Sequence, residues 1–361
     1  MKIVIDTIAF SIQKIGGISV VWYEIIKRLL SDNRIEDSYL EYPNTNYYYE
    51  LLDIPDKKKQ VKNNFLFKLK RYINPFLLVK GPFIFHSTYY RYAKNKNAIN
   101  ITTIHDFTYE ILGSKKSLNY YVHTYQKKKA VEHSDYIVCI SENTKKDTIK
   151  FYKGIDEEKL VVIYNGISDD YIKLKHDELN NLVFPYQTYC IFVGPRRKYK
   201  NYDLVVETIK KTNFNLLLVG PPLSKEEKVK LDIELGNDRY VCLSNVSNQL
   251  LNQFYNGAFC LLYLSSYEGF GIPCLEAQKA GCPVIAFNSS SIPEVVYCKE
   301  MLVDVLDVSS VLSIIRKLHD KKYREKIVDD GIKFANNFSW DKTYKALSTL
   351  YQRAWKNKHN N

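Results

Sequence analysis

The sequence lacks any apolar run long enough to cross a bilayer, which takes roughly 18 to 20 residues. Its longest apolar runs, such as Phe259 to Leu264, have only the length of a strand. The N-terminus, MKIVIDTIAF, also lacks the long apolar stretch and the small-residue cleavage site of a secretory signal. These absences predict a chain without a transmembrane helix that stays in the cytoplasm.

The cysteines lack the number and spacing of disulfide or zinc frameworks. There are 7, none spaced C-x-x-C, and most lie within apolar runs. This pattern is typical of reduced, buried thiols. The sequence also has no H-E-x-x-H and no G-x-S-x-G motif. We therefore expect neither a metal site nor a serine nucleophile elbow.

Acidic residues are missing from one long segment. None occurs between Asp56 and Asp106, where eleven Lys or Arg lie. The net charge of the whole chain is +12, so nearly all of the excess positive charge lies in this segment. Within this segment, residues 57–80 interleave cations with apolar and aromatic residues, as in FLFKLKR at 65–71. Such a stretch suits an anionic membrane surface, to which each basic side chain contributes about 1 kcal/mol. A solvated basic helix and loop is the open alternative, and nucleic acid is disfavoured because no binding motif accompanies the patch.

The length and the hydrophobic pattern predict two domains. A chain of 361 residues exceeds the roughly 150 of one typical domain. Strand-like runs alternate with helical patterns on both sides of a polar stretch at 166–186, which is typical of parallel α/β sheets. The runs fall at residues 2–6, 83–85, 99–104, 136–140, 160–164, 189–193, 215–219, 240–243, 259–264 and 283–287. Two doubly wound domains, followed by a last helix from Asp341, would bind ligands in a cleft at the carboxyl ends of their strands.

The strongest local signal is the run SSYEGFGIPCLEA at 265–277, directly after a strand-like run. Gly269 and Gly271 would let backbone amides approach a ligand, and Glu268 and Glu276 would accept hydrogen bonds from its hydroxyls. Pro273 suits the first turn of a helix, which would place Glu276 in that turn. A polyol such as a sugar or a ribose fits this arrangement. A glycine turn before a helix with an N-terminal carboxylate stays open as the alternative.

Two further loops suit phosphate. VGPRRKYKN at 193–201 follows a strand-like run and precedes a helical pattern, where cations can hold a pyrophosphate. A basic surface turn is the alternative for this loop. The pair Gly16-Gly17 also precedes a helix, although two glycines alone are a weak signal.

One histidine pair stands where a ligand would bind. His105-Asp106 follows the run 99–104, at a carboxyl end that would face the cleft. His86 has a similar place and is the lesser candidate. We interpret the other five histidines as structural; they are His123, His133, His176, His319 and His359.

Taken in order, these pieces resemble the retaining glycosyltransferases of family 4, which have the two-domain GT-B fold. The resemblance covers residues 1 to about 355. It rests on the E-x7-E element of 268–276 with AGCPVIA at 280–286, VIYNGI at 162–167, SENT at 141–144 and TIHD at 103–106. The family implies an α/β chain with an N-terminal acceptor-binding Rossmann-like domain at 1–166 and a nucleotide-sugar-binding one at 167–340. The helix at 341–361 would cross back to the first domain.

The resemblance also implies roles for single residues. Arg196 and Lys200 would hold the donor's diphosphate, with Gly17 as the first-domain amide that closes on it. Glu276 would hold the ribose, and the sugar would be held by Glu268 with the amides of Gly269, Phe270 and Gly271. His105 would lie near the donor sugar and the attacking hydroxyl. Because Gly194 is followed by Pro195 where the family often has arginine, Arg197 is the alternate to Arg196.

The function that this resemblance implies is transfer of a hexose-type sugar, with retention, from a nucleotide-diphosphate sugar to a hydroxyl of a glycan. The acceptor would be a lipid-linked glycan in the synthesis of a surface polysaccharide, such as O-antigen or lipopolysaccharide. No cofactor or divalent metal is expected, because Arg196 and Lys200 could meet the charge of the leaving diphosphate. Residues 57–80 would hold the enzyme at the inner face of the cell membrane. The alternatives are a catalytically silent glycan- or membrane-binding protein of the same fold and a nucleotide-sugar epimerase.

Overall fold

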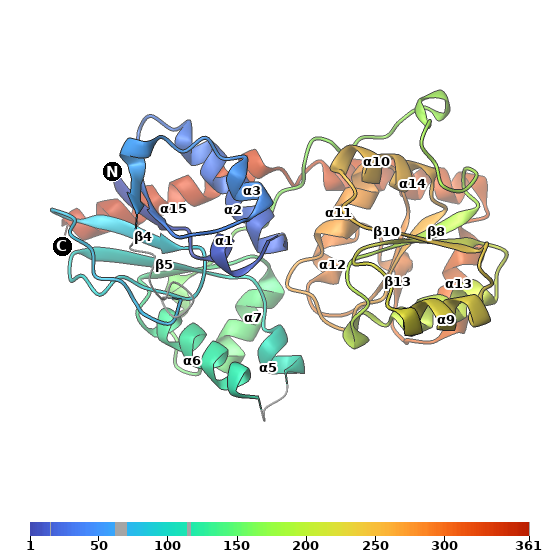
Figure 1. The fold of residues 1–361 in the computed structure, drawn as a ribbon, viewed down its shortest axis with the longest axis horizontal. Coiled ribbons are helices and arrows are strands. Elements are labelled where there is room, and N and C mark those ends of the chain that lie inside the picture. The colour runs from blue at the N-terminus through green and yellow to red at the C-terminus, as the bar shows by residue number, and fades with distance from the viewer. Residues whose placement is uncertain (15, 62–70, 114–116, 361) are drawn as a thin grey trace. The chain divides into compact units, whose positions relative to one another are not determined.

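The computed structural model describes residues 1–14, 16–61, 71–113 and 117–360 (Figure 1). The chain forms two compact units, one of residues 1–165 together with 340–361 and the other of residues 166–339. Residues 62–70 of the basic stretch 57–80 lie outside the described part of the chain. Each unit has its own parallel sheet and is described by itself.

The first unit is built on a seven-stranded sheet in the order β3-β2-β1-β4-β5-β6-β7. Every neighbouring pair of these strands is parallel. The strands are β1 (Lys2–Asp6), β2 (Glu36–Glu41), β3 (Lys59–Val61), β4 (Phe83–Ser87), β5 (Ala98–Ile104), β6 (Tyr136–Cys139) and β7 (Leu160–Val162). The sequence predicted β1 and β4 to β7, but β2 and β3 were missed. The polar sequence EDSYLE hides β2, although Tyr39 and Leu40 are buried in it.

Helices cover both faces of this sheet. They are α1 (Ala9–Ile12), α2 (Gly17–Leu30), α3 (Tyr47–Glu50), α5 (Thr108–Leu112), α6 (Leu118–Glu132), α7 (Glu142–Phe151) and α15 (Trp340–Asn360), with 3₁₀ turns at Asp56–Lys58 and Glu157–Lys159. Figure 1 shows α2 and α15 side by side on one face and α6 and α7 on the other. Side chains alternate accordingly, since Ile3 and Ile5 of β1 join the core beneath α2 and α15, whereas Val4 joins the opposite core.

The second unit is built on a six-stranded parallel sheet in the order β10-β9-β8-β11-β12-β13. The strands are β8 (Tyr189–Val193), β9 (Asn215–Val219), β10 (Tyr240–Leu243), β11 (Cys260–Tyr263), β12 (Val284–Phe287) and β13 (Leu302–Val303). The inner strands are buried on both faces, which is why they read as unbroken apolar runs such as LLLV. The sequence predicted all of them except β13, which has only two residues.

The helices of the second unit are α8 (Tyr202–Lys210), α9 (Lys225–Glu234), α10 (Asn248–Gly257), α11 (Ile272–Lys279), α12 (Ile292–Val295), α13 (Val308–Lys317) and α14 (Lys321–Ala335), with 3₁₀ turns at His176–Glu178, Lys198–Lys200 and Lys299–Met301. The polar stretch 166–186 is tied to α10, because the amides of Ile172 and Leu174 donate to side chains of Asn252 and Asn256. This stretch is therefore part of the second unit.

Among the residues that the structure describes, no helix is both long and apolar enough to span a bilayer. All seven cysteines are described and none forms a disulfide. Five of them are buried, as expected for thiols in apolar runs.

Candidate functional site

Loops from neighbouring strands meet at one edge of the second unit's sheet. The chain runs from β8 outward through β9 to β10 and then returns to β11 on the other side of β8. The carboxyl ends of β8 and β11 therefore flank the point where the strand order reverses. Open α/β sheets bind their ligands at such a point. Both motifs that the sequence singled out in this unit follow these two strands.

The loop after β8 is joined to the loop after β11. Asn201 has a left-handed backbone (φ 49°), and its side-chain amide donates to the carbonyl of Leu264 at 2.7 Å and to the Ser266 hydroxyl at 2.8 Å. The Ser266 amide in turn donates to the Tyr199 carbonyl at 2.7 Å. These bonds fix where Lys200 stands relative to the run 265–277.

Lys200 and Glu268 form an ion pair at this edge. Lys200 Nζ lies 2.7 Å from Glu268 Oε1, and the two side chains are only 8% and 16% exposed. Lys200 Nζ also lies 5.0 Å from the ring centroid of Tyr263, a favourable cation–π arrangement. The structure thus brings together two residues that are 68 positions apart and that the sequence assigned to one site.

The glycine turn after Glu268 is anchored by two serines. The Glu268 amide donates to the Ser290 hydroxyl at 2.9 Å, and the Ser291 hydroxyl interacts with the carbonyls of Glu268 and Phe270, each at 2.9 Å. Gly271 has φ +108°, and a Cβ there would lie 3.0 Å from Ile292 Cδ1. The left-handed backbone therefore favours glycine at this position, and a Cβ would require Ile292 to shift slightly.

Glu276 lies deeper than the sequence suggested. Helix α11 begins at Ile272 with Pro273 in its first turn, and Glu276 is its fifth residue, so the expectation of a first-turn carboxylate was wrong. The Tyr255 hydroxyl donates to Glu276 Oε2 at 3.3 Å. Burial raises the pKa of Glu276 to about 7, against opposing hydrogen bonds from Tyr255 and Tyr171. At neutral pH this carboxyl is poised between its two protonation states.

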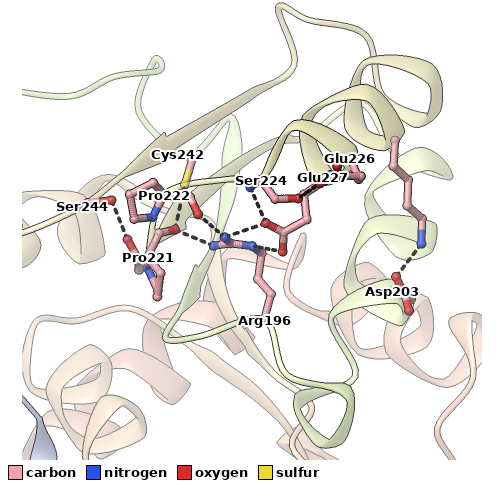
Figure 2. A network of polar contacts seen from close by, with 11 residues as sticks. Arg196, Asp203, Pro221, Pro222, Ser224, Glu226, Glu227, Cys242 and Ser244 are labelled. Atoms are coloured by element: carbon pink, nitrogen blue, oxygen red, sulfur yellow. Dashed lines mark hydrogen bonds and ion pairs between the residues drawn. The ribbon is translucent and has the colours of Figure 1, made fainter.

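Arg196 and Arg197 differ sharply in their surroundings. The Arg196 side chain is 5% exposed and forms an ion pair with Glu227 of α9 at 2.8 Å (Figure 2). Arg197, the next residue, is exposed. The sequence expected Arg196 at the donor diphosphate; in the structure its guanidinium is bonded to Glu227 and to the carbonyls of Pro221 and Pro222.

In the first unit, His105 lies on a loop that is bonded to a buried lysine. It follows β5 and is 9% exposed, and burial lowers its pKa to about 4, with Asp106 opposing and Lys127 adding to the shift. Lys127 Nζ donates to the Asp106 carbonyl and to Glu110 Oε2, both at 2.8 Å. His105 is therefore a neutral imidazole at pH 7, on a loop that a buried cation supports.

The remaining predicted residues of this unit have different surroundings. Gly17 is the first residue of α2, and a Cβ built on it would meet no atom within 4 Å. His86 is buried, with one ring nitrogen 2.8 Å from the Tyr351 hydroxyl and the other 2.8 Å from Thr103 Oγ1. Because both nitrogens are occupied within the fold, His86 is structural.

Sequence reasoning missed several residues that shape these loops. Glu227 could have been found, because Ser224-x-x-Glu227 is a capping-box pattern and forms one in the structure. Tyr255, Ser291 and Lys127 carry no such local pattern. Among the residues that the structure describes, no group of three or more His, Cys, Asp or Glu is placed to hold a metal ion.

Comparison with known proteins connects this geometry to one family. Residues 15–171 match the family model "Glycosyltransferase Family 4" and residues 180–334 match "Glycosyl transferases group 1". The chain is similar to O-antigen chain mannosyltransferase B of Escherichia coli, with 25% identity over 94% of this chain and 97% of the relative.

Solved structures agree on the fold. Sucrose-phosphate synthase from Thermosynechococcus elongatus superposes with a TM-score of 0.74 at 17% identity, over 99% of each chain. The Anabaena protein HepE, solved with UDP-glucose, superposes with a TM-score of 0.71 at 16% identity, over 98% of this chain and 100% of HepE. With two Rossmann-like units and both family matches in order along the chain, this protein is a glycosyltransferase of the GT-B fold and of the family 4 type.

Proposed function

We propose that the chain transfers a hexosyl residue, with retention of configuration, from a nucleotide-diphosphate sugar to a hydroxyl of a lipid-linked glycan in the synthesis of a surface polysaccharide. The observation that carries the proposal is the Lys200–Glu268 pair at the strand-order reversal of the second unit. The E. coli relative named above is an O-antigen chain mannosyltransferase, and HepE was solved with UDP-glucose. The E. coli relative supports a surface glycan as the product, and HepE supports a nucleotide-sugar donor.

Charge is the first requirement of this reaction. Cleavage of the sugar–phosphate bond builds negative charge on the leaving diphosphate, and fixed cations that meet this charge lower the barrier. Lys200 supplies one such cation, and an arginine of the pair Arg196–Arg197 supplies another. As the diphosphate takes over Lys200, Glu268 is freed to accept hydrogen bonds from the sugar. The amides of Gly269, Phe270 and Gly271 belong to the same turn and, with the amide of Gly17, are the backbone donors that we assign to the nucleotide sugar.

Glu276 and His105 have separate tasks in this proposal. Glu276 accepts hydrogen bonds from the ribose hydroxyls of the donor. His105, whose lowered pKa of about 4 keeps it neutral, hydrogen-bonds the transferred sugar or the attacking hydroxyl. A neutral imidazole can both donate and accept, which suits hydroxyl groups.

We assign the acceptor to a groove of about 1400 Å³ in the first unit. Its walls are rich in tyrosine, including Tyr72, Tyr90, Tyr92, Tyr120, Tyr121 and Tyr125. Tyrosines combine a flat apolar face with a hydroxyl, which suits the two sides of a sugar ring. Tyr121→Ala and Tyr125→Ala are expected to raise KM for the acceptor and to leave the donor KM unchanged. Equal changes in both constants would contradict this placement.

Membrane attachment through residues 57–80 is a further part of the proposal. The structure holds Lys58 against Asp37 at 2.6 Å and Lys59 against Asp56 at 3.0 Å, so these two cations are already paired. We expect Lys57→Ser, Lys68→Ser, Lys70→Ser and Arg71→Ser together to abolish flotation with anionic vesicles. The matched control changes four exposed lysines of the second unit, Lys211, Lys321, Lys322 and Lys326, to Ser. Equal flotation of both variants would contradict the proposal.

Transfer itself is tested by donor turnover without metal. Purified protein with EDTA is incubated with UDP-, GDP- and dTDP-sugars, and release of the nucleoside diphosphate is measured. We expect turnover of one donor, its loss in Lys200→Ala and its survival in Lys198→Ala, which removes an exposed lysine from the same loop. Retention is read from the anomeric configuration of the product by NMR. Turnover that required an added divalent ion, or that survived Lys200→Ala, would contradict the assignment.

A further inference from the structure

Nearly all of the hydrogen-bonding capacity of Arg196 is used inside its own unit (Figure 2). Its Nε and Nη2 donate to the two oxygens of Glu227, at 2.8 and 3.0 Å. Nη1 donates to the Pro221 carbonyl at 2.9 Å and Nη2 to the Pro222 carbonyl at 2.8 Å. Four of the five N–H groups of a guanidinium are therefore engaged.

These bonds join two loops and the start of one helix at the carboxyl edge of the sheet. Arg196 belongs to the loop after β8, the two prolines to the loop after β9, and Glu227 to the first turn of α9. Glu227 also accepts from the Ser224 amide at 2.8 Å, which completes the capping box of that helix. The Ser244 hydroxyl, after β10, donates to the Gly220 carbonyl at 2.8 Å.

The loops after β8 and β9 approach each other closely. A Cβ on Gly220 would lie 2.5 Å from the Gly194 carbonyl oxygen, so the backbones after β8 and β9 are in direct contact. Arg196 adds side-chain bonds to this backbone contact, because its guanidinium bonds both Glu227 and the carbonyls of Pro221 and Pro222. Its removal would break the side-chain bonds that join the loop after β8 to the segment 220–224, whose Gly220 stays bonded to Leu243 and Ser244.

The same bonds make Arg196 a poor ligand for a diphosphate. To reach an external anion it would have to leave two carbonyls and a carboxylate, and Glu227, whose side chain is 33% exposed, would lose its cationic partner. Arg197 is exposed and follows directly in the same loop. A cation that is free of such bonds meets an anion without this loss.

We propose that Arg196 is a positioning residue, which fixes the segment 220–224 beside the donor site, and that Arg197 supplies the arginine contact to the donor diphosphate. This inference rests on the proposed function, since it concerns the same donor site. It divides between two neighbouring arginines the tasks of shaping the site and of meeting the charge.

The test compares Arg196→Ala, Glu227→Ala, the double variant and Arg197→Ala by calorimetry with UDP, GDP and dTDP and with the matching monophosphates. If Arg196 positions the loop, Arg196→Ala and Glu227→Ala weaken diphosphate binding by the same factor, about tenfold, and the double variant is no worse. Monophosphate binding falls by a similar factor in these three. Arg197→Ala weakens binding of the diphosphate at least tenfold and of the monophosphate much less, and Arg197→Lys restores most of it.

A second readout needs no nucleotide. Trypsin cleavage after Lys225, which lies at the start of α9, should accelerate several-fold in Arg196→Ala and Glu227→Ala and stay unchanged in Arg197→Ala. If Arg196→Ala does not fold, the milder pair Arg196→Lys and Glu227→Gln gives the same comparison. Wild-type binding in Glu227→Ala beside a loss in Arg196→Ala would overturn the inference. A wild-type protein that bound none of the three diphosphates would overturn the proposed function, and with it the diphosphate contact of Arg197, while trypsin would still decide the role of Arg196.

Discussion

Replacement of Glu276 by glutamine should change how the stability of the protein depends on pH. Burial raises the pKa of this carboxyl from the ordinary 4.5 to about 7 in the folded chain. Between these two values the folded state holds a proton that the unfolded state releases. The free energy of unfolding contributed by Glu276 therefore falls as pH rises from 4.5 to 7 and stays level above that.

The size of this effect follows from the two pKa values. A difference from 4.5 to about 7 corresponds to at most about 3 kcal/mol at neutral pH, because each tenfold change in proton affinity is worth about 1.4 kcal/mol. Glutamine fills the same space and carries no charge at any pH. We therefore expect Glu276→Gln to be more stable than wild type at pH 8 and to approach it at pH 4.5.

The assay is urea unfolding of wild type and Glu276→Gln at pH 4.5, 5.5, 6.5 and 8. Glu325→Gln, which removes an exposed carboxylate from the same unit, is the control and should follow the wild-type curve. Curves for wild type and Glu276→Gln that stayed parallel over this range would refute the argument that burial dominates at this carboxyl. Glu276→Gln should at the same time weaken nucleotide binding, since an amide accepts fewer hydrogen bonds from ribose than a carboxylate.

Three further predictions concern the support of the two sites. Lys127→Met leaves the carboxylate of Glu110 buried without its partner, so the free energy of unfolding in urea should fall by about 3 to 5 kcal/mol. The double variant Lys127→Met with Glu110→Leu should recover part of this loss. A loss under 1 kcal/mol would contradict the burial of this pair. Burial lowers the pKa of His86 to about 3 in the folded chain. The stability that the neutral imidazole contributes is therefore present above pH 6.5 and is lost as pH falls from 6.5 toward 3, so the free energy of unfolding of His86→Gln should depend less steeply on pH in this window. Identical slopes for wild type and His86→Gln would refute this. In Gly271→Ala the new Cβ would lie against Ile292 on a left-handed backbone, so the substitution should lower stability in thermal unfolding by roughly 1 to 3 kcal/mol. Gly154→Ala, with φ +81° and open space around it, should lower stability less. The reverse order would show that the contact with Ile292 is relieved.

The sequence predicted most of the fold because the inner strands of a parallel sheet are visible as continuous apolar runs. Strands such as β8 and β9 are apolar on both faces. Strand β2 was missed because its buried face includes Asp37, whose charge is met by Lys58 from a distant part of the chain. That pairing exists only after folding.

The sequence marked candidate site residues but not the contacts between them. Local motifs marked Lys200 and Glu268, yet nothing in the sequence indicates that they touch. Lys127 shows the limit most clearly, because it stands in a run of three lysines of which Lys128 and Lys129 have side chains 59% and 37% exposed, whereas its own is 0% exposed. Only the packing of α6 against the loop after β5 distinguishes them. Likewise, the sequence named Arg196 with Arg197 as its alternate, and it gave no sign that Arg196 pairs with Glu227.

The central claim is that the carboxyl edge of the second unit's sheet holds the diphosphate of a nucleotide sugar. The most direct measurement is a thermal-shift titration of metal-free protein with UDP, GDP and dTDP, for wild type, Lys200→Ala and Lys198→Ala. A ligand that binds only the folded state at a hundred times its Kd stabilises it by about 2.7 kcal/mol, which is readily seen. We predict a shift with one of the diphosphates that is kept in Lys198→Ala and lost in Lys200→Ala. An equal shift in all three proteins, or none with any diphosphate, would contradict the claim.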